Sequence, residues 1–390
     1  MNRRTFLCTA AAGLPTFARA QSSSLPEAIR NLRPMTGGIQ PITDVERSAR
    51  IEKARRLMHE NRIDTVLMEG GSSSFYFTGV RQDGVLVLPS RGEIIWLSRA
   101  GDDEGKYRTI ASALKDRRVA TGTVGIEERV HFDVVDGVGK LAPALEFTSA
   151  DPVTAGCRMI KSPAEIALMQ RANDITIAAY KAALGSLREG LTQRDLSAMI
   201  GAAYQALGVQ GGAMAIFGKY TAFPHGSVQP QQLREGDLVL IDDGCSVEGY
   251  QSDITRTVIF GKPTDRQRQI WALERKAQDA ALAAAMPGAT CESVDAAARK
   301  VITEAGFGPG YKVPGLPHRT GHGIGLDGHE WTYLVRGNKT RLQPGMCFSD
   351  EPTIAIYGEF GVRLEDCMYI TEDGARMFTK QSPAIDQPFG

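Results

Sequence analysis

The chain has 390 residues, 42% of them hydrophobic and 23% charged, which is enough for two domains that each bury a core. Its 45 Lys and Arg residues equal its 45 Asp and Glu residues, so the formal net charge is zero. This balance argues against a general nucleic-acid-binding or membrane-surface protein, because both depend on an excess of basic residues.

The first 20 residues differ from the rest of the chain and indicate an export signal. Arg3 and Arg4 precede a short, mildly apolar stretch of Ala and Gly, and Ala18-Arg19-Ala20 matches a small-residue cleavage pattern. The segment resembles a twin-arginine signal, so we expect bacterial export to the periplasm and cleavage after Ala20. The apolar stretch is too short to span a membrane, and we expect no membrane span in the mature protein. A disordered basic tail is the alternative interpretation.

The next two segments are predicted as a linker and an α/β domain. Residues 21–43 contain three consecutive serines and three prolines, which is typical of a linker. Residues 44–157 alternate helical and strand patterns, which favours an α/β domain. The expected helices lie at 44–61 and 103–115, and the expected strands at 65–68, 75–77, 84–88, 94–97 and 123–126.

A second domain is predicted over residues 158–390, and the start of its first helix is clearly marked. Ser162 can serve as the N-cap, Pro163 fits the first turn, and Glu165 can close a capping box. Helices and pairs of strands then occur twice in succession along the domain. The later helices are expected to begin at Thr192, Thr264 and Thr290.

Two acidic residues lie within a predicted β-hairpin. The segment 237–260 contains two β-rich runs joined by a Gly-containing connection, which is a hairpin pattern. Asp242 ends the first run and Asp253 precedes the core of the second. We therefore expect the two carboxylates to face each other on paired strands.

Two more acidic residues and a histidine follow in segments of the same kind. Glu351 follows one strand-like run, Glu365 lies within another, and His322 stands between glycines that would let the backbone approach a metal. Four carboxylates among apolar strands are costly to bury as ions unless a cation compensates them. The sequence therefore predicts a site for two divalent metal ions. The oxygen-rich donor set favours manganese, with cobalt, zinc and iron as alternatives.

Four segments in order carry a resemblance to a known family: "IDDGCSVEGYQSDITRT", "HRTGHGIGLDGHE", "FSDEP" and "GVRLEDC". They are similar to the pita-bread metallopeptidases, the family of methionine aminopeptidase, Xaa-Pro aminopeptidase and prolidase, over roughly residues 160–380. Residues 74–79 resemble the creatinase-type N-terminal domain of the Xaa-Pro enzymes. The resemblance implies an α/β N-terminal domain followed by an α+β, pseudo-twofold "pita-bread" catalytic domain.

The resemblance also implies a role for each metal ligand. Asp242 would chelate the first metal ion, whereas His322 and Glu351 would complete the second. Asp253 and Glu365 would bridge the two ions. A hydroxide bridging the ions would attack the peptide carbonyl, since metal coordination lowers the pKa of bound water.

Further residues are assigned near the substrate by the same resemblance. His225 and His329 match the substrate-facing histidines of the family, which could hydrogen-bond the carbonyl oxygen or the leaving amide. Arg363 is a candidate because of its spacing rather than the resemblance: it stands two residues before Glu365, on the same face of a strand, and could orient a carboxylate or a proton-relay partner; a surface ion pair is the alternative. For His318, a contact behind the ligands and a contact with substrate are equal alternatives.

The implied function is a metal-dependent hydrolase that removes the residue before proline, as a Xaa-Pro aminopeptidase or Xaa-Pro dipeptidase. The N-terminal domain favours these members of the family, because the short methionine aminopeptidases lack it. The expected partner is a peptide substrate, and the resemblance implies a homodimer. A metal-dependent or creatinase-like hydrolase of a small amidated metabolite is the alternative, and a non-catalytic peptide-binding module is a third.

Two features leave the family pattern or stay open. Where the family commonly has Glu-Pro-Gly-Ile-Tyr, this chain has Glu351-Pro-Thr-Ile-Ala355, so a tyrosine is missing, although Tyr357 could replace it. The five cysteines beyond residue 20 lack the spacing of a disulfide framework and are expected to fill apolar space. A metal-binding thiolate at Cys245 or Cys367 is the alternative.

Overall fold

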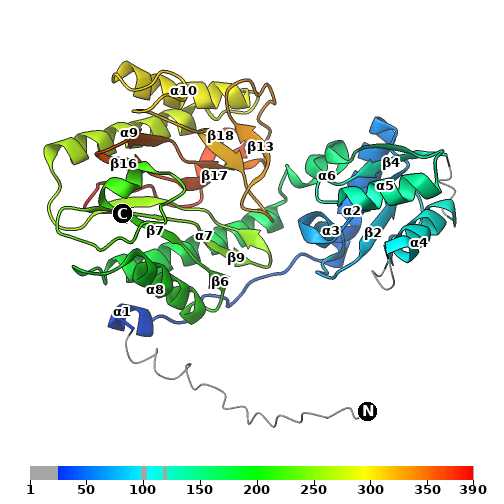
Figure 1. The fold of residues 1–390 in the computed structure, drawn as a ribbon, viewed down its shortest axis with the longest axis horizontal. Helices are drawn as coiled ribbons and strands as arrows, with labels where there is room; N and C mark the ends of the chain where they lie inside the picture. Colours follow the sequence, from blue (N-terminus) through cyan, green and yellow to red (C-terminus); the bar gives the residue numbers. More distant parts are fainter. Residues whose placement is uncertain (1–24, 98–102, 117–120, 390) are drawn as a thin grey trace, which may run out of the picture.

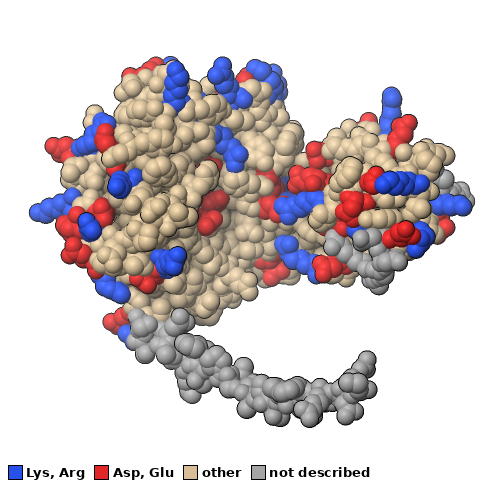
Figure 2. All heavy atoms as spheres, viewed as in Figure 1, with Lys and Arg blue, Asp and Glu red and all other residues tan. Residues whose placement is uncertain are grey.

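The computed structural model describes residues 25–97, 103–116 and 121–389, which form two lobes (Figure 1). The export signal predicted for residues 1–20 lies outside the described residues. Within these ranges, no helix combines the length and the apolar character needed to cross a bilayer. Basic and acidic side chains are interspersed on the face shown in Figure 2, in agreement with the neutral composition.

The N-terminal domain is a five-stranded mixed sheet between two layers of helices. The strand order is β3-β2-β1-β4-β5, with β1 antiparallel to β2 and parallel to β4. The strands are β1 (Thr65–Met68), β2 (Val85–Pro89), β3 (Ile95–Leu97), β4 (Thr123–Ile126) and β5 (Glu146–Ser149). Helices α2 (Asp44–Asn61), α3 (Gly71–Thr78) and α6 (Asp151–Arg158) form one layer, and α4 (Asp103–Asp116) and α5 (Phe132–Leu141) form the other.

Strand β1 shows why this domain has helices on both faces. Its side chains are all buried, and successive side chains of a strand point to opposite faces of the sheet. Val66 and Met68 belong to the core shared with α2 and α3, whereas Leu67 belongs to the core shared with α4 and α5. A strand that is apolar on both faces requires a cover on each, which explains the predicted α/β pattern.

The strand predicted at residues 75–77 is wrong, because these residues belong to helix α3. Gly70 and Gly71 both have positive φ and turn the chain away from the end of β1. Tyr76 and Phe77 are then buried on the side of α3 that faces the core. Their aromatic character suggested a strand, but burial against the neighbouring helices decided the local structure.

The C-terminal domain consists of two halves that each contain a pair of helices and antiparallel strands (Figure 1). The first half comprises α7 (Pro163–Leu184), α8 (Gln193–Ala206), β6 (Gln210–Gly211), β7 (Met214–Phe217), the 3-10 helix η1 (Gly218–Ala222), β8 (Leu238–Asp242), β9 (Cys245–Val247), β10 (Tyr250–Gln251) and β11 (Arg256–Ile259). The second comprises α9 (Asp265–Ala284), α10 (Cys291–Glu304), β12 (Gly321–Gly323), β13 (Glu330–Leu334), β14 (Cys347–Asp350), β15 (Thr353–Ile356), β16 (Phe360–Arg363), β17 (Asp366–Thr371) and β18 (Gly374–Met377).

The sheets of the two halves meet along the middle of the domain. In the first half the strand orders are β11-β8-β7 and β10-β9-β6, and in the second they are β13-β12-β14-β17-β18 and β15-β16. Two hydrophobic cores support them: one lies largely beneath α7 and α8, the other beneath α9 and α10. Strand β16 of the second half contacts β8 and β11 of the first half, so the two halves of the domain join at these strands.

The predicted helix starts of this domain are confirmed. Ser162 caps α7 and forms the expected capping box with Glu165, and Pro163 occupies the first turn. The capping boxes at Ser162, Thr192 and Thr264 satisfy backbone N–H groups that have no partner within the helix, whereas the Thr290 side chain makes no such bond. Thr192, Thr264 and Thr290 are the N-caps of α8, α9 and α10.

The segment predicted as a linker, residues 21–43, differs from that expectation in its described part. Helix α1 (Glu27–Arg30) packs against α7 and α8, and Ile29 is buried there. Downstream, the Met35 N–H donates to the Leu207 carbonyl at 2.9 Å. The apolar side chains of this segment pack against the hydrophobic core before the chain crosses to α2 (Figure 1).

Buried ion pairs also join the two domains. Glu330, at the start of β13, is 4% exposed and lies 3.1 Å from Nζ of Lys161 in the connection between the domains. It also pairs with Arg158, the last residue of α6. Burial would raise the pKa of the Glu330 carboxyl, but the charges of Lys161 and Arg158 lower it to about 2.

Replacing Glu330 with Gln is expected to change how stability depends on pH. The folded-state pKa of about 2 lies below the ordinary value of 4.5, so these ion pairs stabilise the fold fully above pH 4.5 and lose that contribution as the pH falls toward 2. The advantage of wild type over Glu330→Gln, measured by urea unfolding, should therefore shrink by roughly 3 kcal/mol over this interval. A difference that stays constant with pH would contradict this explanation.

Candidate metal centre

The five predicted metal ligands line one cavity of about 570 Å³ in the C-terminal domain. They come from both halves of the domain, and most stand at or just beyond strand ends, where side chains can turn out of the sheet. The predicted substrate-facing residues line the same cavity. Together these are Asp242, Asp253, His322, Glu351 and Glu365, with His225, His329 and Arg363.

The two aspartates approach each other in a way that the hairpin pattern did not predict. Strands β8 and β11 pair in antiparallel fashion, but Ile241 is opposite Arg256, and Asp242 is opposite Met214 of β7. Asp253 lies outside the strands, after the excursion that contains β9 and β10. The expectation that Asp242 and Asp253 face each other on paired strands is therefore wrong. Their carboxylate oxygens nevertheless lie within 4.8 Å of each other and of Glu365.

His322 shows that this site is built for a cation. The Nδ1 atom lies 3.1 Å from the Gly323 carbonyl, which can only accept, so Nδ1 carries the proton. The Nε2 atom then presents its lone pair to carboxylate oxygens of Glu351 at 3.2 Å and Asp253 at 3.7 Å. Burial and the neighbouring His329 lower the pKa of His322 to about 3, so the ring does not supply the positive charge. A bound cation would resolve this repulsion.

The carboxylates themselves are crowded and short of partners. Burial, together with the charges of the neighbouring carboxylates, raises the pKa of Asp253 and of Glu365 well above the ordinary range, and burial raises that of Glu351 to about 7. Oε1 of Glu365 is buried and has no hydrogen-bond partner among the described residues. Groups that are costly to ionise in the empty protein are suited to binding cations, because a cation removes the mutual repulsion.

Among the described residues, three groups of three residues place their ligand atoms close together: two consist only of predicted ligands and share Glu365, and the third joins Asp253 and His322 with His329. His322, Glu351 and Glu365 offer atoms that all lie within 4.8 Å of one another, and so do Asp242, Asp253 and Glu365. Two adjacent sites with a common carboxylate are the arrangement that a pair of divalent ions requires. The donor set therefore fits the predicted pair of ions, and the assignment of each ligand stays a prediction.

Arg363 places a positive charge beside the acidic cluster. Its guanidinium donates to Asp242 Oδ2, to the Thr255 hydroxyl at 3.0 Å and to the Pro224 carbonyl at 3.1 Å. The side chain is 3% exposed, so the alternative of a surface ion pair does not describe it. Burial would lower the pKa of Arg363, but Asp242 and the other carboxylates raise it, and the group is a fixed cation.

The two substrate-facing histidines differ in their surroundings. His225 is exposed in the turn after η1, next to the Pro224 carbonyl that Arg363 holds. His329 stacks on His322, with ring centroids 3.8 Å apart, and its Nδ1 accepts from Arg319 at 2.7 Å. Because Nδ1 accepts, the neutral His329 ring carries its proton on Nε2 and can donate from that atom. Its substrate role stays a prediction.

Replacing Arg319 with Leu is expected to lower kcat about tenfold, because His329 loses the contact that fixes its tautomer and ring position. The metal content should not change, since Arg319 belongs to neither ligand group. Arg336→Leu provides a control at an exposed arginine that does not line the cavity. Steady-state kinetics of the two variants measure the difference, and a change below twofold for Arg319→Leu would argue against this role.

The structure adds two hydroxyl residues to the site that sequence reasoning missed. The Thr255 hydroxyl lies 2.5 Å from Asp242 Oδ1 and 2.7 Å from Glu365 Oε2. The Ser349 hydroxyl accepts from the His322 N–H at 3.0 Å and donates to Glu351 Oε1 at 3.2 Å. Each stands two residues from an acidic residue of the site, and this spacing, which puts side chains on one face of an extended chain, is the signal that could have found them.

The open features of the sequence are placed as follows. His318 contacts the Arg319 carbonyl and the Thr353 hydroxyl, at 2.7 and 2.9 Å, which favours a role behind the ligands. Tyr357 is 54% exposed and stacks on Phe223, and it does not line the cavity in place of the missing tyrosine.

The five described cysteines are free and buried, as expected of apolar fillers. Burial raises the pKa of the Cys245 and Cys367 thiols, which disfavours a thiolate ligand.

Comparisons with known proteins agree with both domains. The family described as metallopeptidase family M24 matches residues 167–372, and the creatinase/prolidase N-terminal domain matches residues 50–160. A Xaa-Pro dipeptidase from Pyrococcus furiosus is 32% identical over 344 residues, which cover 85% of this chain and 97% of that protein. A Xaa-Pro dipeptidase from Lactobacillus delbrueckii subsp. lactis is 40% identical over 296 residues, which cover 73% and 77%.

A solved structure resembles the whole arrangement. The dipeptidase PepE from Mycobacterium ulcerans superposes with a TM-score of 0.81 at 27% identity, and the match covers 90% of this chain and 100% of that chain. Because the likeness includes both domains, it confirms the fold class predicted from the sequence: an α/β domain followed by an α+β, pseudo-twofold pita-bread domain.

Proposed function

This chain belongs to metallopeptidase family M24, and from that premise we propose that it is a Xaa-Pro dipeptidase. As a member of that family it is a hydrolase of peptide bonds. The single observation that carries the proposal is the pair of ligand groups that share Glu365 within one cavity. The two relatives described above are Xaa-Pro dipeptidases that match over most of their length, which favours a dipeptide over a longer peptide as substrate.

The residues at the centre would divide the work of hydrolysis. Asp242, Asp253, His322, Glu351 and Glu365 would hold two divalent ions. When bound, such ions supply a nucleophilic water of lowered pKa and polarise the peptide carbonyl. Arg363 keeps Asp242 oriented, and the Nε2–H of His329 is available to donate to the substrate oxygen as negative charge develops. A Xaa-Pro bond carries no N–H, so the site needs no acceptor for one.

For the metal, we propose manganese, with cobalt, zinc or iron as less favoured occupants. Four carboxylates and one imidazole form a donor set that is mostly hard oxygen, which suits manganese. The natural occupant can be identified by elemental analysis of protein purified without added metal. Manganese is supported if it is the main ion recovered and if it restores the highest activity to chelated protein; recovery of another ion alone contradicts this assignment.

The substrate proposal is tested with a peptide panel on the purified, manganese-loaded protein. We expect cleavage of Xaa-Pro dipeptides, with slower cleavage of Xaa-Ala dipeptides and of Xaa-Pro tripeptides. Efficient tripeptide cleavage would identify an aminopeptidase instead. Cleavage of N-acyl amino acids without cleavage of Xaa-Pro peptides would support a hydrolase of amidated metabolites and would contradict the proposal.

We also propose that the protein is exported in folded form through a twin-arginine pathway. The support is the order of charged, apolar and small residues from Arg3 to Ala20. The test expresses wild type and a variant with Arg3→Lys and Arg4→Lys, and compares periplasmic and cytoplasmic fractions. Export of the wild type alone, with a mature N-terminus at Gln21, supports the proposal, and equal export of both contradicts it.

A homodimer is proposed as the state in solution. Besides the resemblance, helix α5 of the N-terminal domain exposes Phe132, at 81%, and Leu141, which is an unusual position for large apolar side chains. Light scattering on the eluting protein measures the mass directly. A monomer at micromolar concentration would contradict the proposal, and conversion of a dimer to a monomer by Phe132→Asp would place the contact on α5.

A further inference from the structure

One loop connects the two stacked histidines of the site, and the N-terminal domain holds it. Strands β12 and β13 pair in antiparallel fashion, with Gly323 opposite Glu330, so residues 324–329 form the closing loop. His322 lies on the strand that enters the loop, and His329 is the last loop residue. The position of the His329 ring in the cavity therefore depends on how rigidly this loop is held.

The inner side of the loop is wound around the carboxylate of Glu330. Oε1 of Glu330 accepts from the backbone N–H groups of Leu326 at 2.8 Å and Asp327 at 3.1 Å. Gly325 leaves no room for a side chain, because a Cβ there would lie 2.8 Å from Glu330 Oε2. A buried carboxylate can organise a loop in this way only if its own charge is balanced.

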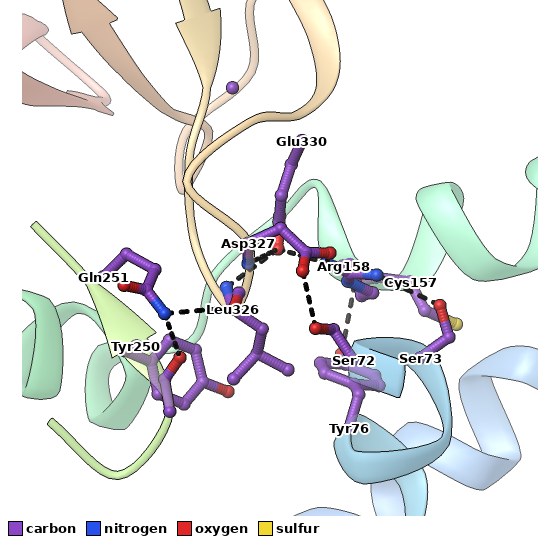
Figure 3. Close-up of polar contacts among 12 residues, drawn as sticks. Ser72, Ser73, Tyr76, Cys157, Arg158, Tyr250, Gln251, Leu326, Asp327 and Glu330 are labelled. Atoms are coloured by element: carbon purple, nitrogen blue, oxygen red, sulfur yellow. Dashed lines mark hydrogen bonds and ion pairs between the residues drawn. The ribbon is translucent and has the colours of Figure 1, made fainter. Parts of the chain in front are cut away.

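The balancing charge comes from Lys161, in the connection between the domains, and from Arg158 of the N-terminal domain. Arg158, at the end of α6, pairs with Glu330 and donates to Asp327 Oδ2 at 2.6 Å. Its other terminal nitrogen donates to the Ser73 hydroxyl of α3 at 3.0 Å (Figure 3). The guanidinium of Arg158 thus connects the loop to the N-terminal domain. Only 9% of its side chain is exposed.

Asp327 is the outer attachment point of the loop. Besides Arg158, its carboxylate accepts from the Ser72 hydroxyl of α3 at 2.7 Å (Figure 3). It also pairs with Arg129 at 2.9 Å. All three partners belong to the N-terminal domain. From its own domain the loop receives three further contacts: the Gln251 N–H donates to the Gly325 carbonyl at 2.7 Å, the Gln251 side-chain amide donates to the Leu326 carbonyl at 3.5 Å, and the Ile324 N–H donates to the Cys347 carbonyl at 3.2 Å.

We infer that Arg158 is a positioning residue through which the N-terminal domain fixes the loop 324–329 and thereby the ring of His329. The inference rests on the proposed role of His329 at the substrate. It gives the N-terminal domain a part in positioning a substrate-facing group, although none of the described residues of that domain lines the cavity. When Arg158 is lost, Asp327 keeps Ser72 and Arg129 and Glu330 keeps Lys161, but the two carboxylates lose the partner that joins them, and the loop that ends at His329 is held less rigidly.

The experiment compares Arg158→Gln with two other variants. Arg158→Lys keeps the charge but cannot contact two carboxylates with a planar fork, so it should restore part of the function. Arg50→Gln is the matched control: Arg50 is also a buried arginine between the domains, but it contacts Tyr250 and Glu165 and not the loop. This control separates loop positioning from general docking of the domains.

Two measurements are made on each variant. Hydrogen exchange of metal-free protein should show faster exchange of the Leu326 and Asp327 amides in Arg158→Gln and unchanged exchange there in Arg50→Gln. This result does not depend on substrate, so it remains informative if the proposed activity fails. In the loaded enzyme, kcat of Arg158→Gln should fall by about 10- to 100-fold with KM changed less than threefold, since misplacing a catalytic group acts on the transition state.

The possible outcomes decide the matter. Selective loosening of the loop and a loss confined to kcat, both partly reversed in Arg158→Lys, support the inference. Unchanged exchange of the loop amides in Arg158→Gln, or equal loosening in Arg50→Gln, overturns it. If Arg158→Gln does not fold, Asp327→Asn takes its place, because that change removes the outer attachment of the loop and leaves the buried pair of Arg158 with Glu330 intact.

Discussion

Replacing Glu365 with Gln is expected to reduce peptidase activity by at least about 10³-fold. Glu365 is the residue common to both ligand groups, so its loss removes a ligand from each of the two proposed ions. The substitution keeps the size of the side chain and the Oε2 position that contacts Thr255. Any loss of activity therefore reports the missing negative charge and metal ligand rather than a cavity.

Metal analysis is the measurement that accompanies the kinetics. Glu365→Gln should bind fewer than two ions per chain after reconstitution, whereas wild type should bind two. Glu274→Gln is the matched control, because Glu274 is equally buried in α9, burial raises its pKa well above the ordinary range, and it does not line the cavity. Full metal content and near wild-type turnover in Glu365→Gln would overturn the proposed centre.

The effect of metal removal on the melting temperature is a second, independent test of Glu365→Gln. In the chelated wild type, four carboxylates face one another without a cation, and the fold loses the free energy of metal binding, which is about 2.7 kcal/mol at a free metal concentration of 100 times Kd. The melting temperature should therefore fall when a chelator is added. Glu365→Gln carries one charge less in the cluster, so the fall should be smaller. An equal fall in both proteins would contradict the cation explanation.

The residues that meet at the centre could be predicted from the sequence, but their geometry could not. Each ligand stands in a short motif of Gly, Asp or Glu beside an apolar run, and such local signals survive in a single sequence. The pairing of Asp242 and Asp253 was predicted wrongly because β9 and β10 form an excursion between the two residues. Register depends on contacts between strands, which a hydrophobic pattern defines only loosely.

The contacts between domains had no local signal at all. Arg158 meets Asp327 and Glu330 across separations of 169 and 172 residues, and nothing near Arg158 in the sequence marks it as different from other arginines. The same holds for Arg319, whose contact with His329 depends on how β12 and β13 pair. The helix starts of the C-terminal domain, by contrast, were predicted correctly, and at α7, α8 and α9 the signal is a capping box completed within four residues.

Replacing Arg363 with Met is the second change for which a large effect is expected. Breaking a buried ion pair by removing one partner costs about 3–5 kcal/mol of stability, because the remaining charge is left without compensation. Here the remaining charge is Asp242, and the Pro224 carbonyl next to His225 also loses its donor. We therefore expect kcat/KM to fall by about 10²- to 10³-fold, with a lower melting temperature.

Arg363→Lys separates the charge of this residue from its shape. Lysine supplies one positive charge but not the planar fork that reaches Asp242, Thr255 and Pro224 together. If Arg363 acts mainly by balancing charge, Lys should recover most of the stability and most of the activity. If it acts by holding Asp242 and the His225 turn in one geometry, Lys should recover stability while kcat/KM stays at least about tenfold low. The second result is expected, because the three contacts link strand β16 to both sides of the cavity. Activity within threefold of wild type in Arg363→Met would remove Arg363 from the site.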